Sequence, residues 1–355
     1  MVEMELKRVF AQFDACGEPV EIAPLGNGHI NRTFLVTCES GEKYVLQQIN
    51  ERVFGDVALL MRNITRVTEY LNAQRPGSSL CFLSARAGGS FVEENGAKYR
   101  LYRYVPGICL EKAEKPAELN ACGVAFGEFQ QALSLFDASQ LGEVIPRFHD
   151  TVKRLNDLEA AAQADAADRA KSVKGELDFY LSRKDEAGKM LDMQLSGALK
   201  TRVTHNDTKL NNVILEKDTL RPLCVIDLDT VMPGLAGNDF GDCIRSGAST
   251  GAEDENDVSK VQLDLSMYAA FARGFLSRCG QALNKAEIKT LPLGAYLMTY
   301  ECGARFLTDY LNGDVYFHTA YPDHNLVRTR TQMKLVADSE KNWNRLQQII
   351  QDSLH

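Results

Sequence analysis

RVTHNDTKLNNVILEKDTLRPLCVIDLDT, residues 202–230, is a strand-rich segment between long helical patterns. Its β-branched and apolar runs are separated by a polar loop and then by a turn, which predicts strand, loop, strand, turn and strand. The loop reads HNDTKLNN and begins at His205. Polar side chains at fixed offsets between two strands are typical of a site that performs chemistry.

The spacing His205, Asp207 and Asn212 reproduces the H-x-D-x-x-x-x-N pattern of kinase catalytic loops. Phosphoryl transfer needs a carboxylate that accepts the proton of the attacking hydroxyl, and oxygen ligands for Mg²⁺ on the phosphates of ATP. Asp207 fits the first role and Asn212 the second, while Lys209 is placed to neutralise the transferred phosphoryl group. The alternative is a polar turn, since Asn and Asp tolerate turn conformations.

The second predicted metal ligand is Asp227, because the apolar run before it predicts a buried strand that delivers its carboxylate beside the loop. The sequence DFG at residues 239–241 matches the magnesium motif of protein kinases, but it lies twelve residues further on, beyond a Pro-Gly loop. We therefore expect Asp239 to accept backbone hydrogen bonds that support the catalytic loop, or to cap a helix that starts near residue 240. For Asp242 we favour a surface or capping role.

The amino-terminal part predicts a small antiparallel sheet over residues 20–49, followed by a helix at 56–73 that Asp56 caps. Within it, GNGHINRTFLV places glycines and an asparagine where a kinase has its phosphate-covering loop. The candidate ATP-binding residues there are Gly26, Gly28 and Asn31; a simple Gly-rich hairpin turn is the alternative.

One expected kinase residue is missing from this part of the chain. YVLQQI puts Gln47 or Gln48 where kinases carry the strand lysine that binds nucleotide phosphates. Further along, Tyr104 and Val105 are candidates to bind the adenine edge through their backbone groups, with a plain edge strand as the alternative.

The pattern changes after residue 106. Long helical patterns follow, at residues 116–136, 147–163, 170–195, 257–280 and 284–312. The sequence therefore predicts an α+β fold with two parts: residues 1–106 as a nucleotide-binding lobe, and residues 107–355 as a mostly helical lobe that carries catalytic and substrate-binding residues.

The formal net charge of −8 argues against nucleic acid or an anionic membrane surface as a partner. Nine cysteines show no CxxC pair and no zinc spacing, which indicates reduced thiols and a cytoplasmic location. No apolar stretch is long enough to cross a membrane, and the N-terminus lacks the features of a signal peptide.

The blocks RVTHNDTKLNNVIL and VIDLDTVMPG resemble the aminoglycoside phosphotransferase-like kinases, which have a two-lobed, protein-kinase-like fold. Longer blocks are similar to the bacterial N-acetylhexosamine 1-kinases as a group, among them GNGHINRTFLVT, ECGARFLTDYLNGDVYF and YPDHNLVRTRTQ. The resemblance implies ATP- and Mg²⁺-dependent phosphorylation of the anomeric hydroxyl of N-acetylglucosamine or N-acetylgalactosamine. It also implies that His205 and Asp239 support the catalytic loop.

For the sugar, the resemblance nominates His29, Asp229, Arg305 and Tyr316, with Asp207 on the attacking hydroxyl. Asp229 is expected to share a strand face with Asp227. The alternatives are a hairpin-tip His29, a solvent-facing Arg305 and a core Tyr316. The rival functions are kinases of the same superfamily that act on homoserine, choline, another sugar or an aminoglycoside, and a nucleotide-binding pseudokinase. The choice of hexosamine and the oligomeric state stay open.

Overall fold

The computed structural model describes residues 2–26 and 30–354, and the chain forms two compact units. Unit 1 comprises residues 1–108, 139–145 and 214–232, and unit 2 comprises the remaining segments, 109–138, 146–213 and 233–355. A single division at residue 106 is therefore too simple. Residues 214–232 belong to unit 1 because Leu215 forms a bridge with Ile108, and Asp229 forms an ion pair with Arg100.

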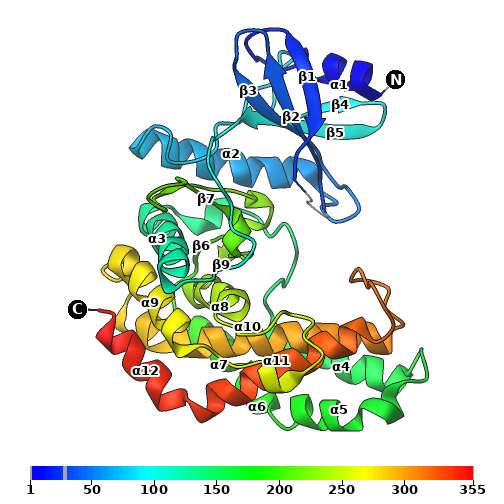
Figure 1. Cartoon of the computed structure of the whole chain (residues 1–355), viewed down its shortest axis with the longest axis vertical. Helices are drawn as coiled ribbons and strands as arrows, with labels where there is room; N and C mark the ends of the chain where they lie inside the picture. Colours follow the sequence, from blue (N-terminus) through cyan, green and yellow to red (C-terminus); the bar gives the residue numbers. More distant parts are fainter. Residues whose placement is uncertain (1, 27–29, 355) are drawn as a thin grey trace. The chain divides into compact units, whose positions relative to one another are not determined.

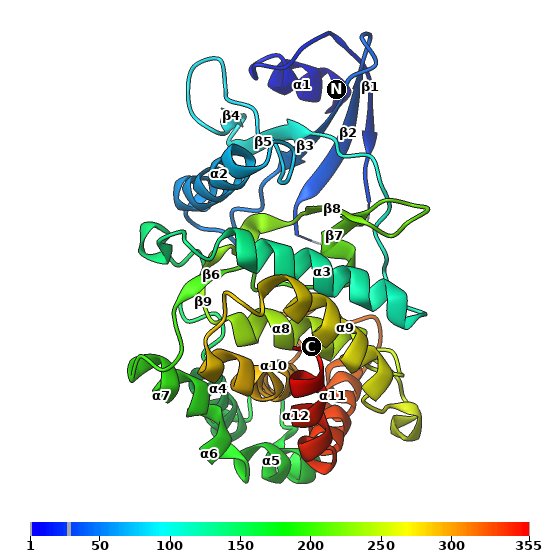
Figure 2. The same ribbon diagram turned by 90° about the vertical axis from the view of Figure 1, so that its left-hand side faces the viewer.

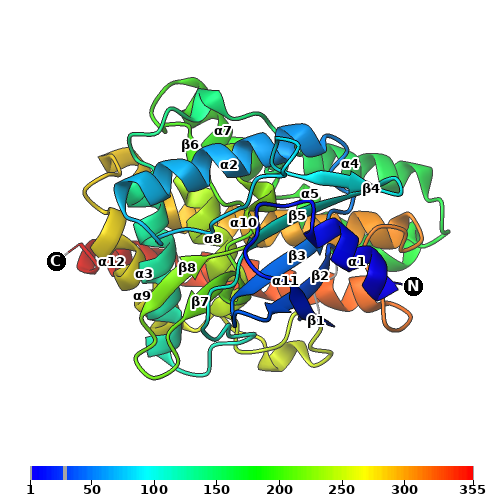
Figure 3. The same cartoon turned by 90° about the horizontal axis from the view of Figure 1, so that it is seen from above.

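Unit 1 contains a five-stranded antiparallel sheet in the order β1-β2-β3-β5-β4, and Figure 3 shows β2, β3 and β5 side by side. The asparagine and glycine between β4 and β5, Asn95 and Gly96, both have positive φ, as a two-residue hairpin turn requires. The predicted cap is also present, since the side chain of Asp56 accepts a hydrogen bond from the Leu59 nitrogen. The elements are α1 (Val2–Phe10), β1 (Pro19–Pro24), β2 (Arg32–Cys38), β3 (Lys43–Gln48), α2 (Val57–Gln74), β4 (Val92–Glu94), β5 (Ala97–Arg103), β8 (Pro222–Val225) and the 3₁₀ turn η4 (Leu228–Thr230).

The sheet has an apolar core on the side of α1. Phe10 of α1 packs in one buried cluster with Val36, Leu46, Tyr99 and Leu101 of the strands. Because side chains alternate along a strand, the residues between these point to the opposite side of the sheet. Helix α2 lies on that side (Figure 1). The alternation therefore gives unit 1 an apolar face toward α1 and a second face that can carry polar groups.

Unit 2 is mostly helical, which confirms the predicted α+β class. Its longest helix, α10, packs against α4, α8 and α11, and α3 packs along α9 (Figure 2). The helices are α3 (Pro116–Ala132), α4 (Thr151–Ala164), α5 (Lys174–Leu181), α6 (Lys184–Ala187), α7 (Lys189–Leu195), α8 (Ala236–Gly247), α9 (Leu265–Cys279), α10 (Lys285–Leu311), α11 (His324–Lys341) and α12 (Trp343–Asp352). The shorter elements of unit 2 are β6 (Arg202–Thr204) and the 3₁₀ turns η2 (Ala170–Val173), η3 (Leu210–Asn212) and η5 (Val258–Lys260). Three elements belong partly to each unit: β7 (Val213–Leu215), β9 (Met232–Gly234) and the 3₁₀ turn η1 (Ala138–Gln140).

Two helical predictions are wrong in detail. Residues 170–195 form η2, α5, α6 and α7 rather than one helix, and α9 begins at Leu265, where Asp264 caps it, rather than at 257. The strand predictions around the polar loop agree with β6, β7 and β8, which pair as β6-β9 and β7-β8. Among the described residues, every helix is too short or too polar to span a lipid bilayer.

Candidate active site

The polar loop predicted from sequence lies between β6 and β7 in unit 2 and brings three of its side chains together. The Asp207 carboxylate is 2.7 Å from the Lys209 ammonium and 3.2 Å from the Asn212 amide nitrogen. Asn212 also donates to the backbone oxygen of Asp207, at 2.8 Å. The turn η3 makes this possible, because it folds Asn212 back over the residue five positions earlier.

Charge in this loop is balanced by neighbouring carboxylates. Burial opposes the protonation of Lys209, but the charges of Asp207 and Asp242 outweigh it and raise the pKa of the ammonium group. Lys209 is therefore a cation at neutral pH. About half of its side chain stays exposed, so it can reach an anionic ligand from its position beside Asp207.

Asp239 holds the start of the loop. Its carboxylate accepts hydrogen bonds from the backbone nitrogens of His205 (3.0 Å) and Asn206 (2.8 Å), and from the side-chain amide of Gln130 (2.7 Å). This is one of the two arrangements considered above; a cap is not found, because α8 begins three residues earlier, at Ala236. Burial raises the pKa of the carboxyl group, although the His205 charge and these hydrogen bonds oppose the shift.

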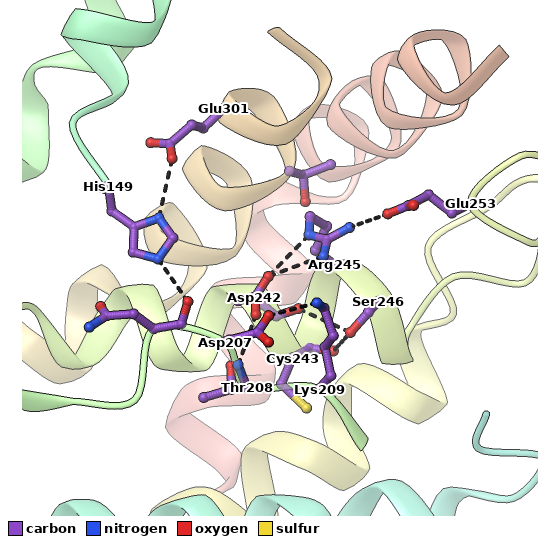
Figure 4. A network of polar contacts seen from close by, with 12 residues as sticks. His149, Asp207, Thr208, Lys209, Asp242, Cys243, Arg245, Ser246, Glu253 and Glu301 are labelled. Carbon is purple, nitrogen blue, oxygen red and sulfur yellow. Dashed lines mark hydrogen bonds and ion pairs between the residues drawn. The ribbon is translucent and has the colours of Figure 1, made fainter. Parts of the chain in front are cut away.

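Asp242 differs from the expectation of a surface or capping residue, because it is buried (Figure 4). It accepts a hydrogen bond from the Thr208 nitrogen at 2.9 Å and forms an ion pair with Arg245 at 3.2 Å. Burial raises the pKa of Asp242, but the charges of Arg245, Lys209 and His149 outweigh it and lower the pKa overall. The carboxylate is ionised and holds the loop next to Asp207.

A third contact with the loop comes from His149, to which the sequence analysis assigned no role. The ring nitrogen Nε2 lies 3.2 Å from the backbone oxygen of Asn206, and Nδ1 lies 3.2 Å from the Glu301 carboxylate (Figure 4). Both partners are acceptors, so the doubly protonated ring suits both. Burial lowers the pKa of His149, but Glu301 outweighs it and raises the pKa overall. Nothing local in the sequence signals this pair, because 152 positions separate its members.

The sugar-binding candidates Arg305 and Tyr316 lie together in unit 2. The Arg305 guanidinium is 6.0 Å from the centre of the Tyr316 ring and 5.8 Å from that of Phe148, the neighbour of His149. Tyr316 is 69% exposed rather than part of the core. Its backbone nitrogen donates to Asp309 at 2.8 Å, which fixes the segment after α10.

In unit 1, the chain turns sharply at Asp227, two residues after β8 ends. Asp227 is exposed and has a left-handed backbone (φ 57°), and η4 follows it. Asp227 and Asp229 therefore do not share a strand face as predicted, because a 3₁₀ turn replaces the strand. Asp229 is buried, and its two carboxylate oxygens accept hydrogen bonds from Arg100 and from Asn31, the latter at 2.6 Å.

The other nucleotide-binding candidates in unit 1 are only partly described. Gly26, two residues after β1, has a left-handed backbone (φ 70°), while Gly28 and His29 lie outside the described residues. Asn31 is buried, and its amide oxygen accepts a hydrogen bond from the Asn50 nitrogen at 3.0 Å. Its side chain therefore joins protein groups at both ends and is not available to a ligand.

Of the two residues predicted to bind adenine, which follow β5, only one has an available backbone nitrogen. The Tyr104 nitrogen donates to the Lys43 oxygen at 3.0 Å, so it extends the sheet and is not available to a base. Among the described residues of unit 1, the Val105 nitrogen has no hydrogen-bond acceptor. Val105 is therefore the better donor of the two predicted residues.

Two of the predicted residues carry oxygen atoms of the kind that Mg²⁺ prefers. Asn212 directs its amide nitrogen to Asp207, which leaves its amide oxygen for a cation. Among residues 2–26 and 30–354, no three His, Cys, Asp or Glu side chains are grouped to hold a metal ion. Mg²⁺ commonly takes one or two protein oxygens together with substrate phosphates and water, and an amide oxygen such as that of Asn212 or a carboxylate such as that of Asp227 is a ligand type that suits it.

A family model described as the phosphotransferase enzyme family matches residues 21–274. An aminoglycoside phosphotransferase from Alicyclobacillus acidocaldarius has a similar structure, with 14% identity, a TM-score of 0.67 and coverage of 97% of this chain and 96% of that one. A microcompartment-associated aminopropanol kinase has 15% identity and a TM-score of 0.60, with coverage of 98% of this chain and 98% of that one. A choline kinase from Cryptosporidium parvum has 13% identity and a TM-score of 0.61, with coverage of 100% of this chain and 99% of that one. At these identities the structures show a common fold.

Proposed function

The chain belongs to the phosphotransferase enzyme family, and on that premise we propose that it transfers the γ-phosphoryl group of ATP to the anomeric hydroxyl of an N-acetylhexosamine. The products would be ADP and the sugar 1-phosphate. The observation that carries the kinase reaction is the cluster of Asp207, Lys209 and Asn212 on a loop that three neighbouring side chains hold. Such a rigid polar loop fits a reaction whose catalysis is mostly positioning and electrostatics.

In the proposed reaction, Asp207 accepts a hydrogen bond from the attacking hydroxyl and then its proton, while the oxygen of that hydroxyl forms the new bond to phosphorus. The bond from phosphorus to the bridging oxygen of ADP breaks in line. Lys209 neutralises negative charge on the transferred group. No covalent phosphoenzyme is required, because one carboxylate and two substrates suffice for direct transfer.

The nucleotide would be held mainly by groups of unit 1. We assign the adenine edge to the Val105 nitrogen and the Tyr104 backbone oxygen, and the phosphates to the backbone around Gly26, Gly28 and Asn31. Asn212 and Asp227 would hold Mg²⁺, which would neutralise negative charge on the phosphates when bound.

The acceptor is inferred from the resemblance and from local charge. Burial and the charge of Arg305 lower the pKa of Arg154, so two guanidinium groups lie near the Phe148 to Tyr316 region. Choline, aminopropanol and aminoglycosides are cations at neutral pH, and two arginines disfavour them, although the carboxylates of Glu301 and Asp157 offset part of this positive charge. A neutral sugar can instead stack on the exposed Tyr316 ring and accept hydrogen bonds from Arg305. His29, which lies outside the described residues, and Asp229 are the other residues that the resemblance nominates for the sugar.

The test is ADP release by the purified protein with ATP, Mg²⁺ and a set of acceptors, with the product identified by NMR. The set contains N-acetylglucosamine, N-acetylgalactosamine, glucose, galactose, homoserine, choline, aminopropanol and kanamycin. A 1-phosphate formed from either N-acetylhexosamine supports the proposal. Phosphorylation of a cationic acceptor alone keeps the kinase and removes the sugar assignment, and ATP binding without any turnover favours a pseudokinase.

A further inference from the structure

The sheet of unit 1 lacks the lysine that kinases use to bind nucleotide phosphates. In those enzymes the lysine lies on the third strand and its ammonium group contacts phosphate oxygens. Here β3 carries Gln47 and Gln48 at the corresponding positions, and neither side chain is charged. If this chain binds ATP, another cation must do that work.

Arg100 lies directly beside the vacant position. In the antiparallel pairing of β3 with β5, Gln47 and Arg100 are opposite each other. The neighbours of Arg100 along β5, Tyr99 and Leu101, belong to the apolar core on the side of α1. Arg100 therefore points to the other side of the sheet, together with Gln47, because side chains alternate along a strand.

The Arg100 guanidinium is buried and held on two of its three nitrogens. Nε donates to the Gln47 side-chain oxygen at 2.9 Å, and Nη1 donates to Asp229. Among the described residues of unit 1, Nη2 has no acceptor. Arg100 is only 2% exposed, so its charge is desolvated, and a charge-assisted hydrogen bond at this place is strong.

The partners of Arg100 are themselves fixed. Gln47 donates from its amide nitrogen to the Thr33 hydroxyl at 3.0 Å, and Asp229 takes the Asn31 amide at 2.6 Å on its second oxygen. Asn31 follows the segment that contains Gly26 and Gly28, both nominated for the phosphates. Two side-chain amides and one carboxylate thus hold the Arg100 guanidinium in a fixed orientation on this face of the sheet.

The carboxylates near Arg100 favour the charged form of its guanidinium group. Burial lowers its pKa, but Asp229, followed by Tyr102 and Asp227, outweighs burial and raises it. Asp227 is the proposed metal ligand of unit 1. The charge of Asp227, which would face the phosphates, therefore acts on Arg100.

We propose that Arg100 replaces the strand lysine, with Nη2 donating to a phosphate oxygen of the adenine nucleotide, and that Asp229 is a positioning residue for Arg100 rather than a sugar ligand. The proposal rests on the proposed function, because it requires an ATP site in unit 1. It assigns a binding role to a residue that matches no lysine motif in the sequence.

The test compares nucleotides that differ only in their phosphates. Titration calorimetry with adenosine, AMP and ADP, without an acceptor, gives three affinities for the wild type and for Arg100→Met. Loss of one charged hydrogen bond should weaken ADP by about 10- to 100-fold and leave adenosine within about twofold. A merely structural role would weaken both ligands together.

Two further variants keep the test valid if Arg100→Met fails to fold, since that change leaves Asp229 buried without its cation. Arg100→Met with Asp229→Asn removes both charges and lets the new amide oxygen keep the Asn31 hydrogen bond. Arg100→Met with Gln47→Lys moves the cation to the opposite strand and should recover part of the ADP affinity. Arg103→Met, at an exposed cation of the same strand, is the matched control and should bind ADP as the wild type does.

The outcomes separate this inference from the proposed function. A selective loss of ADP affinity, with recovery by Gln47→Lys, supports Arg100 as the phosphate cation. Equal losses for adenosine and ADP, or no loss, overturn it while the kinase assignment stands. A wild-type protein that binds no adenine nucleotide overturns both.

Discussion

The Asp239 carboxylate lies 2.8 Å from the backbone nitrogen of Asn206, the residue before Asp207. Asn206 has a left-handed backbone (φ 64°), a conformation that asparagine adopts more readily than most other non-glycine residues. With His205, Asp239 thus fixes two consecutive N–H groups and sets the direction in which the next side chain leaves the chain. The position of Asp207 is therefore determined from α8.

Asp239→Asn should lower both stability and turnover. An amide has one oxygen where the carboxylate has two, so one of the three donors around it would lose its acceptor and face an NH₂ group instead. Burying an unsatisfied donor costs about 1–3 kcal/mol, and loss of the charge adds to this. Thermal unfolding and ADP release measure the two effects.

The control for this change is Asp257→Asn, at an exposed cap where Asn caps about as well as Asp. It should match the wild type in both measurements. An Asp239→Asn protein of normal stability that had lost only its metal affinity would show that Asp239 is the metal ligand and that the role given to Asp227 is wrong.

Asp207→Asn should reduce kcat by about 10²-fold or more, which is typical when a general base is removed. The affinity for ATP should stay near that of the wild type, because most of the proposed nucleotide contacts lie in unit 1. Stopped-time ADP assays and calorimetry with a non-hydrolysable ATP analogue measure the two quantities. Asp218→Asn, in an exposed turn, is the matched control. Turnover that survives in Asp207→Asn would remove this residue from proton transfer.

The part of the site that could be predicted from sequence is the part built by near neighbours. Asp207, Lys209 and Asn212 lie within six positions, so their spacing fixes their approach once the loop is recognised. The hairpin at Asn95 and Gly96 was predictable for the same reason, since only a few residues tolerate positive φ in a two-residue turn.

The part that sequence did not reveal depends on distant pairs. Asn31 and Asp229 are 198 positions apart, and Arg100 and Asp229 are 129 apart, so no local pattern could connect them. The prediction that Asp227 and Asp229 share a strand face was wrong. A strand was expected to continue through both residues, but a 3₁₀ turn follows Asp227 and places Asp229 in a buried, paired position. Burial of Asp242 was missed because, besides Arg245 on its own helix, its partner is Thr208 in the loop 34 positions away.

The His149 and Glu301 pair predicts a pH dependence of stability. The folded-state pKa of His149 is raised above the usual value of about 6.5, so its contribution is complete below pH 6.5 and is lost as pH rises through the raised pKa. The pKa of Glu301 is lowered because, although burial raises it, the His149 charge and hydrogen bond prevail; its contribution is lost as pH falls through the lowered value. The pair should stabilise most between about pH 4.5 and 6.5.

Glu301→Gln tests this pair. Thermal unfolding of the wild type and the variant across pH should show the largest difference between about pH 5 and 6, and a smaller one as pH rises, with about 1.4 kcal/mol for each unit by which the His149 pKa is raised. Gln keeps an acceptor for Thr151, so the change removes mainly the charge. A difference that is constant from pH 5 to 9 would mean that His149 is neutral in the fold.

The close approach of α8 and α10 gives a last prediction, because α8 carries the two aspartates that hold the catalytic loop. A methyl group on Gly294 of α10 would lie 2.2 Å from the backbone oxygen of Gly237 on α8, so one helix must move. Gly294→Ala should therefore destabilise the fold by about 1–3 kcal/mol, in spite of the better helix propensity of Ala. The displacement should also loosen Asp239 and Asp242 and lower kcat more than it raises KM for ATP.

Gly175→Ala on α5, where an added methyl group meets nothing within 4 Å, is the control and should be neutral or slightly stabilising. If Gly294→Ala unfolds at the wild-type temperature with full activity, the packing of α8 on α10 does not set the geometry of the loop.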